Sequence, residues 1–152
     1  MAEFLSKELE AVKGPFVPVA LDAANATNAR VKRFRATFDL AAQASGSTLV
    51  LIDKLPKSFV FLAAMVTTSV TLGTATLSID GVHTDEDGVE QVETGKYSTA
   101  RAITSVETPV LLGKTTASEE REYDEKITAT VGTAALPASG TLVIDVLCSS
   151  VA

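Results

Sequence analysis

One short phrase of small and β-branched residues occurs three times in this chain of 152 residues. Residues 44–53 and 138–145 share Ala-Ser-Gly, then Thr-Leu-Val, then Ile-Asp, and a weaker copy lies at 73–80. Glycine supplies the backbone freedom of a tight turn, and Thr, Leu, Val and Ile suit a pleated, half-buried surface. Each phrase therefore predicts a turn that leads into a β-strand. None carries a reactive group at its turn, which favours a β scaffold over a catalyst.

Period-two alternation extends this pattern. In residues 33–40, Phe34, Ala36, Phe38 and Leu40 are expected to face a core while the residues between them face out. Residues 58–70 are apolar throughout, which predicts a strand covered on both faces. Seven or eight short strands separated by turn signals predict an all-β protein, an antiparallel β-sandwich of jelly-roll-like type. The other expected strands are 48–52, 74–80, 126–131 and 141–149, with weaker ones at 97–106 and 109–112.

The first thirty residues have a different character. Two prolines within residues 15–18 exclude a helix there and predict an extended segment. The apolar stretch before them has a helical period but is too short to be stable alone in water. We therefore divide the chain into an extended N-terminal arm, 1–29, which must dock on its own domain or on a neighbour, and a β-sandwich domain, 30–152. The large apolar residues on one side of that short helical pattern are Phe4, Leu5, Leu9 and Val12.

Charge is unevenly distributed. Residues 1–57 hold 8 basic and 6 acidic residues, a net +2, whereas residues 58–152 hold 5 and 13, a net −8, which together give the −6 of the chain. Such an acidic chain is a poor candidate for nucleic-acid binding. The asymmetry is either ordinary surface charge or a basis for ordered contact between copies or with another protein.

The sequence shows no secretory or membrane-spanning pattern and has one cysteine. The start lacks the pattern of a secretory signal, and the longest apolar run, 59–66, is far shorter than the roughly 20 residues that span a bilayer. We therefore expect no membrane partner and synthesis in a reducing cytoplasm. Cys148 is the only cysteine, so an intrachain disulfide is excluded, and its apolar surroundings predict a buried thiol.

Candidate catalytic and metal sites are weak. Residues 83–88 contain Asp85 and Asp87 before a glycine, but the spacing of a calcium loop fails, so an acidic, solvated loop is expected. His83 is the only histidine, and no Gly-x-Ser-x-Gly elbow accompanies it. Residues 119–126 are interpreted as a solvated turn before a strand. We predict no enzyme, no catalytic, cofactor or metal residues, and no small-molecule substrate.

A basic cluster at residues 30–35 has two open interpretations. The first is contact with an acidic partner, either protein or nucleic acid. The second is that its charge protects an edge strand from pairing with a wrong strand. Together with the apolar residues of the arm, it gives the predicted partner-binding set: Phe4, Leu5, Leu9, Val12, Phe16, Val17, Arg30, Lys32, Arg33 and Arg35.

The order of the turn and strand phrases from about residue 34 to 147 resembles small virion proteins of tailed bacteriophages. The resemblance implies a structural protein of the particle, foremost a capsid decoration (cement) protein on the capsid surface, made in the bacterial host cytoplasm. It implies the major capsid protein and other copies of the chain, as a dimer or trimer, as partners, and no cofactor. The phrases that carry it are residues 38–46, 55–56, 68–76, 95–97, 108–113 and 130–142.

Two other functions stay open from the sequence. The same sandwich would serve as a neck, tail or head-fibre-base component of the virion. It would also serve as a receptor- or carbohydrate-binding module, although such modules use exposed aromatic rings and this chain has two Tyr and no Trp.

Overall fold

A computed structural model describes residues 31–114 and 121–150, and in these ranges the regular structure consists of β-strands alone. The prediction of an all-β chain is therefore confirmed. No helix in the described part is long and apolar enough to cross a bilayer. The strands are β1 (Val31–Asp39), β2 (Thr48–Leu55), β3 (Phe59–Thr68), β4 (Thr76–Thr84), β5 (Glu90–Ala102), β6 (Val110–Leu112), β7 (Glu125–Gly132) and β8 (Thr141–Ser150).

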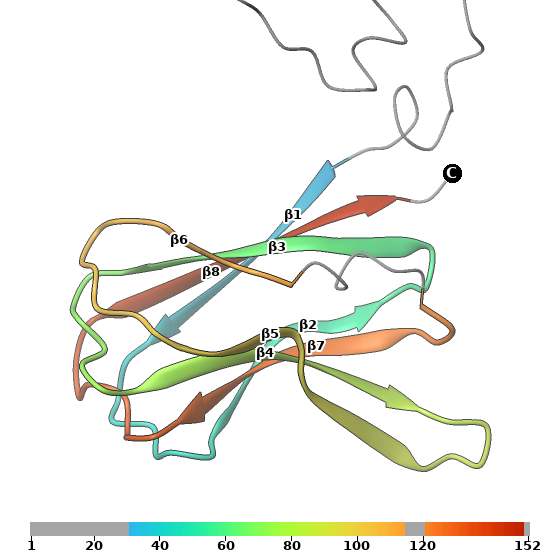
Figure 1. Ribbon diagram of the computed structural model, residues 1–152, viewed down its shortest axis with the longest axis horizontal. Coiled ribbons are helices and arrows are strands. Elements are labelled where there is room, and N and C mark those ends of the chain that lie inside the picture. The colour runs from blue at the N-terminus through green and yellow to red at the C-terminus, as the bar shows by residue number, and fades with distance from the viewer. Residues whose placement is uncertain (1–30, 115–120, 151–152) are drawn as a thin grey trace, which may run out of the picture.

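The strands form two four-stranded layers (Figure 1). One sheet has the order β1-β8-β3-β6 and the other β2-β7-β4-β5, and every neighbouring pair is antiparallel. Apart from the β4–β5 hairpin, successive strands lie in opposite sheets, which is a jelly-roll-like arrangement. The predicted sandwich is confirmed, with β1, β6, β2 and β5 as its edge strands.

The repeated phrase has the structural role that the sequence predicts. Its glycines have positive φ values, +91° at Gly46, +62° at Gly73 and +119° at Gly140. Each turn leads directly into β2, β4 or β8. A side chain at Gly140 would also meet Val70 Cγ2 at 2.7 Å, so both backbone conformation and space require glycine there.

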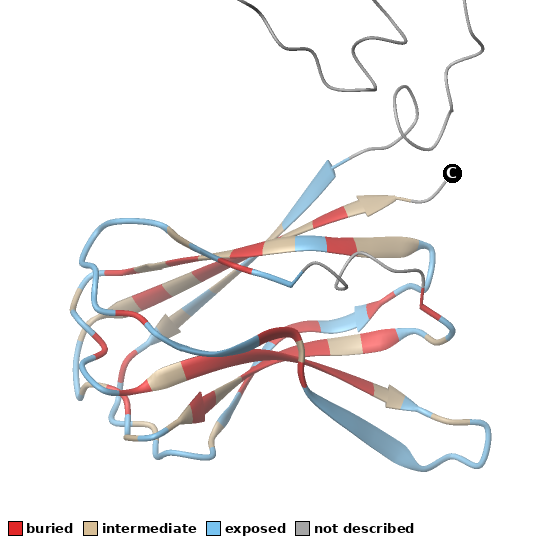
Figure 2. Cartoon of the chain, viewed as in Figure 1, coloured by how far each residue is buried: buried red, intermediate tan, exposed pale blue. Residues whose placement is uncertain are grey.

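The core lies between the two sheets and is mostly aliphatic (Figure 2). Phe34, Ala36 and Phe38 pack against it and Leu40 is buried, as the alternation in β1 predicts. Cys148 is fully buried, and burial raises the pKa of its thiol to about 11. The largest fully buried side chains are Tyr97, Phe61, Leu55, Leu77, Ile79, Ile103, Leu112, Ile127, Leu142 and Ile144.

One prediction for β3 is wrong. The strand was expected to be covered on both faces, but only its inner face is buried, by Phe61, Ala64 and Val66. The outward face is half-buried, and Leu62 is 41% exposed. Unbroken apolar sequence therefore marks an outer surface here as well as the core.

β4 and β5 form a hairpin that projects beyond the body of the sandwich (Figure 1). The pairing shifts register between Ile79 and Gly81, where β5 takes extra residues around Gly95. Asp80 is 1% exposed and accepts hydrogen bonds from the Gly95 N–H at 2.6 Å and from the Thr130 hydroxyl. A bulge of this kind bends a strand and increases its twist. Because the carboxylate of Asp80 fixes the bulge, it also sets the direction of the hairpin.

Candidate functional site

The structure describes three of the ten predicted partner-binding residues. Lys32, Arg33 and Arg35 lie on β1, an edge strand, and all three are exposed. The others lie outside the described residues, so their role and the division at residue 30 stay predictions. They are Phe4, Leu5, Leu9, Val12, Phe16, Val17 and Arg30.

Alternation along β1 places Lys32 on the opposite face from Arg33 and Arg35. Lys32 Nζ lies 5.1 Å from the centre of the Phe59 ring, which also meets Phe34 edge to face. Arg33 forms no salt bridge within the described residues. Of the three, Arg33 is therefore the side chain with its charge most available to a partner.

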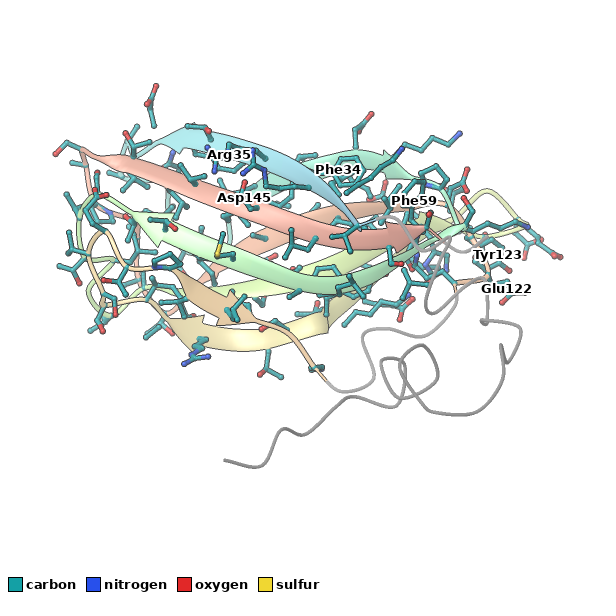
Figure 3. The ribbon with its side chains drawn as sticks, turned by 90° about the horizontal axis from the view of Figure 1, so that it is seen from above. Phe34, Arg35, Phe59, Glu122, Tyr123 and Asp145 are labelled. Carbon is teal, nitrogen blue, oxygen red and sulfur yellow. The ribbon has the colours of Figure 1, made fainter. Side chains whose placement is uncertain are left out.

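Arg35 is held by Asp145 of β8, its direct neighbour in the antiparallel register (Figure 3). The guanidinium donates from Nε at 2.8 Å and from Nη2 at 2.9 Å to the two carboxylate oxygens. The side chain of Asp145 is 3% exposed, whereas that of Arg35 is 53% exposed. The hydrogen bonds from Arg35 lower the pKa of Asp145 below its ordinary value near 3.8. Arg35 thus covers a buried carboxylate and still presents one side of its guanidinium to solvent.

Arg35→Ala should lower the free energy of unfolding by about 1–2 kcal/mol at pH 7, because a nearly buried carboxylate loses its partner while water partly replaces it. The folded pKa of Asp145 is lowered, so the pair stabilises above pH about 4 and this contribution is lost as pH falls through the folded pKa. Urea unfolding should show the difference from the unaltered chain at pH 7 and a smaller one at pH 3. The matched control, Arg33→Ala, should change stability by less than about 0.5 kcal/mol. Equal losses for the two variants would contradict this assignment.

A buried polar cluster closes the end of the sandwich where β7 begins. Glu125 is 3% exposed and accepts hydrogen bonds from Lys96 Nζ and from the Tyr97 hydroxyl. Lys96 Nζ also donates to Glu93 Oε1 at 3.0 Å. Burial alone would lower the pKa of Lys96, but its hydrogen bonds to Glu125 and Glu93 raise it overall. Burial and the bond to Glu125 raise the pKa of Tyr97.

Arg121 belongs to the same cluster, which corrects the prediction of a solvated turn at residues 119–126. Its side chain is 2% exposed, and Nη1 lies 3.8 Å from Glu125 Oε2. The guanidinium donates to backbone carbonyls between β2 and β3, those of Leu55 at 3.2 Å, Phe59 at 2.6 Å, and Pro56. Arg121 therefore has a structural role: it connects the loop between β2 and β3 to the start of β7.

His83 lies at the outer side of this cluster. Its ring stacks on Tyr123 with centroids 5.0 Å apart, and Nδ1 lies 3.4 Å from Glu93 Oε1. The ligand atoms of His83, Glu93 and Glu125 lie within 4.8 Å of one another, a set that would suit a cation. Lys96 Nζ already bonds both carboxylates, so its ammonium supplies the positive charge between them. Lys96, Glu93 and Glu125 thus form an ion network, and the buried Nδ1 of His83 beside it has no hydrogen-bond partner among the described residues.

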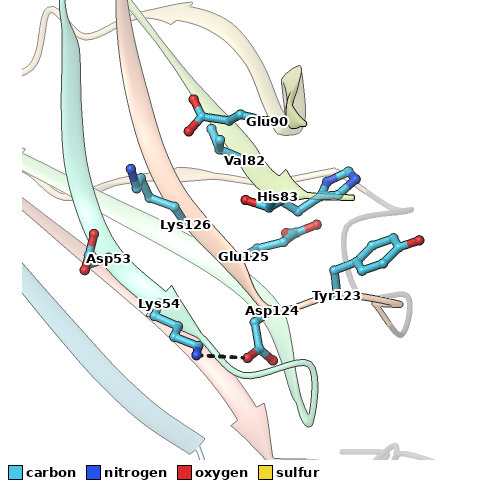
Figure 4. Close-up of a pocket in the computed structure, with 10 residues that line it drawn as sticks. Asp53, Lys54, Val82, His83, Glu90, Tyr123, Asp124, Glu125 and Lys126 are labelled. Atoms are coloured by element: carbon cyan, nitrogen blue, oxygen red, sulfur yellow. Dashed lines mark ion pairs between the residues drawn. The ribbon is translucent and has the colours of Figure 1, made fainter. Parts of the chain in front are cut away.

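A cavity of about 410 Å³ opens beside His83 and Tyr123, where the ends of β2, β4 and β7 meet (Figure 4). Its walls carry both charges, including the ion pair of Lys54 and Asp124, whose charged atoms are 3.5 Å apart. The lining residues include no serine or cysteine that would act as a nucleophile beside His83.

Few aromatic rings are accessible on the described surface. Tyr97 is buried and Tyr123 has one ring face covered by His83. Every other ring in the described part is buried or half-buried. Stacking on a sugar needs an accessible ring face, so these residues do not favour the carbohydrate-binding interpretation.

The acidic turn of the β4–β5 hairpin is organised by Asp85. Its carboxylate accepts hydrogen bonds from the N–H groups of Asp87 at 3.1 Å and Val89 at 2.8 Å and from Gln91 Nε2 at 2.9 Å. These bonds lower the pKa of Asp85. Asp85 therefore shapes the turn, and the exposed charges of the hairpin come from its neighbours.

Comparison with solved structures places this fold among phage capsid components. The chain is similar to one in the capsid of Ralstonia phage GP4, with a TM-score of 0.61, 18% identity and coverage of 97% of both chains. It is also similar to one in the capsid asymmetric unit of cyanophage Pam1, with a TM-score of 0.53, 14% identity, and coverage of 82% of this chain and 86% of that one. The resemblance found in the sequence is thus confirmed at the level of the fold. No protein-family model and no curated protein sequence matches the chain.

Proposed function

We propose that the chain is a capsid decoration (cement) protein that binds the outer surface of a phage head and clamps neighbouring major capsid subunits. The observation that carries this proposal is the fold match to a chain of the Ralstonia phage GP4 capsid over 97% of both chains. A match from end to end supports a common role better than a match to one module of a larger protein. The role needs no catalysis and no cofactor.

The chemistry of the surface supports this proposal. Large apolar side chains are exposed on both sheets and on the hairpin, which suits contact with protein. Among the four edge strands of the described residues, β1 and β5 offer backbone groups at their outer edges for further pairing. The exposed apolar residues are Val31, Val50, Leu62, Val89, Val92, Val106 and Leu111.

In this proposal the N-terminal arm is the anchor. An arm that orders only on binding covers a large surface, and its apolar residues would lie on the capsid subunits. Arg33 and the exposed side of Arg35 would add charge contacts at the point where the arm leaves β1. The protein would then be made in the cytoplasm of the bacterial host and added to the head.

The proposal is tested with capsids that lack the protein. The purified chain is added, and the temperature of DNA release is measured before and after. We expect this temperature to rise with occupancy and to level off when the sites are filled. Particles that already carry the protein serve as the control and should gain nothing. No binding, or binding with no change in release temperature, would count against a clamp and would favour a neck, tail or fibre-base role.

A further inference from the structure

Two features of the sandwich carry opposite charge and lie on different sheets. The first is the acidic hairpin, defined here as residues 84–93 of β4, β5 and their turn. It has five acidic residues and no lysine or arginine, and it projects from the body (Figure 1). Asp85 accepts hydrogen bonds within the turn, and Glu93 forms a salt bridge with Lys96. The other three acidic residues are exposed and form no salt bridge within the described residues: Glu86, Asp87 and Glu90.

The acidic hairpin also has a free edge and apolar side chains. Within residues 31–114 and 121–150, β5 pairs only with β4, so alternate residues of β5 direct their N–H and C=O groups away from the sheet. Val89 and Val92 are 53% and 59% exposed. A free edge flanked by exposed valines is a template for pairing with another strand.

The second feature is the basic edge, defined here as residues 31–35 of β1. β1 pairs only with β8, so its other edge is free within the described residues. Lys32 and Arg33 are exposed, and Val31 beside them is 62% exposed. Like the acidic hairpin, the basic edge thus combines a free strand edge, an exposed valine and exposed charged side chains, but its charge is opposite.

We propose that the acidic hairpin of one copy docks on the basic edge of a second copy, so that copies associate head to tail. The outer edges of β1 and β5 would pair through the backbone, with the exposed valines in contact. Glu90 on β5 and Glu86 in the adjoining turn would lie near the basic side chains of Lys32 and Arg33. Opposite charges across paired strands stabilise the contact, and like charges destabilise it.

Charge also selects the mode of association. Pairing of two basic edges, or of two acidic hairpins, brings like charges together, so symmetric contacts through the same patch are disfavoured. Only contact between an acidic hairpin and a basic edge is favourable. In a dimer formed this way, one copy keeps a free basic edge and the other keeps a free acidic hairpin. Heterologous contacts of this kind close into rings or extend as chains. The charges that disfavour pairing of β1 with itself therefore favour an acidic edge as its partner, and the acidic hairpin of another copy supplies one.

The test uses the full-length chain in solution, without capsids, and two variants that each remove one patch. The edge variant is Lys32→Gln with Arg33→Gln, and the hairpin variant is Glu86→Gln with Glu90→Gln. Lys57→Gln with Glu122→Gln is the matched control, because both residues are exposed and lie outside the two patches. Sedimentation velocity at low and high salt gives the species present, and circular dichroism verifies that each variant is folded.

The unaltered chain and the control should associate with concentration, and salt should weaken the association because exposed charges are screened. Each variant alone should associate at least ~10-fold more weakly, about 1.4 kcal/mol. An equimolar mixture of the two variants should form a dimer and stop there, because only one complementary pair of patches remains. A monomeric unaltered chain at low salt, variants that associate normally, or a mixture that stays monomeric would each overturn the proposal. Since no capsid is present, such a failure leaves the decoration function standing.

Discussion

Arg121→Ala should lower the free energy of unfolding by about 3–5 kcal/mol, the range found when one partner of a buried ion pair is removed. The guanidinium of Arg121 is almost fully buried and serves carbonyls of Leu55, Pro56 and Phe59 as well as facing Glu125. Alanine would leave those carbonyls unpaired and deprive Glu125 of one of its cationic neighbours. Native domains are stable by about 5–15 kcal/mol, so the loss would be a large part of the whole.

Arg101→Ala is the matched control for this prediction. Arg101 is exposed and makes one hydrogen bond, from Nη1 to the Leu111 carbonyl at 3.2 Å. Its replacement should cost less than about 1 kcal/mol. Urea unfolding followed by circular dichroism compares the two variants at pH 7. If both variants lose the same small amount, Arg121 does not hold the end of the sandwich together.

Deletion of residues 1–29 should leave a folded sandwich that binds capsids at least ~10-fold more weakly, about 1.4 kcal/mol. The hydrophobic core of the described residues begins at Phe34, so the deletion removes none of it. Burial of one large apolar side chain of the arm contributes roughly 1.5–3 kcal/mol. Ordering the backbone opposes this by about 1–2 kcal/mol per residue. The net contribution per arm is therefore modest, and many copies on one shell make it effective.

The truncated and full-length proteins are compared on the same undecorated capsids, with circular dichroism to verify the fold of each. The single variant Arg101→Ala, altered on the sandwich and not in the arm, should bind as the unaltered chain does. Equal occupancy and equal thermal protection by the truncated protein would show that the arm is not the anchor. The basic edge of β1 would then be the next candidate.

Local pattern was sufficient to predict most of the fold. The alternation in β1 and the three glycine turns depend on neighbours in sequence, so the strands they define agree closely with β1, β2, β4 and β8. The extended hairpin of β4 and β5 was missed, because Glu90 and its polar neighbours lack the apolar alternation that predicts a strand. Their strand structure follows from β4 and from the turn of Asp85.

The structural roles of the buried charged residues were harder to predict from the sequence. Asp80, Asp145 and Arg121 are separated from their hydrogen-bond partners by 15 to 110 positions, and no local pattern marks these pairs. The two carboxylates, Asp80 and Asp145, each end a copy of the repeated phrase, so the repeat was the available sequence signal. Asp80 fixes a bulge, and Asp145 binds Arg35. The third copy ends in Asp53, which is exposed. Sequence repetition thus located the positions, and the tertiary structure assigned their roles.

The number of copies per particle tests the proposed decoration function most directly. Quantitative mass spectrometry of purified virions, with the major capsid protein as the internal standard, gives this number. A protein that clamps neighbouring subunits over the whole shell should be present in hundreds of copies, in a fixed ratio to the major capsid protein. About a dozen copies or fewer would contradict the proposal and would assign the chain to a vertex, neck or tail instead.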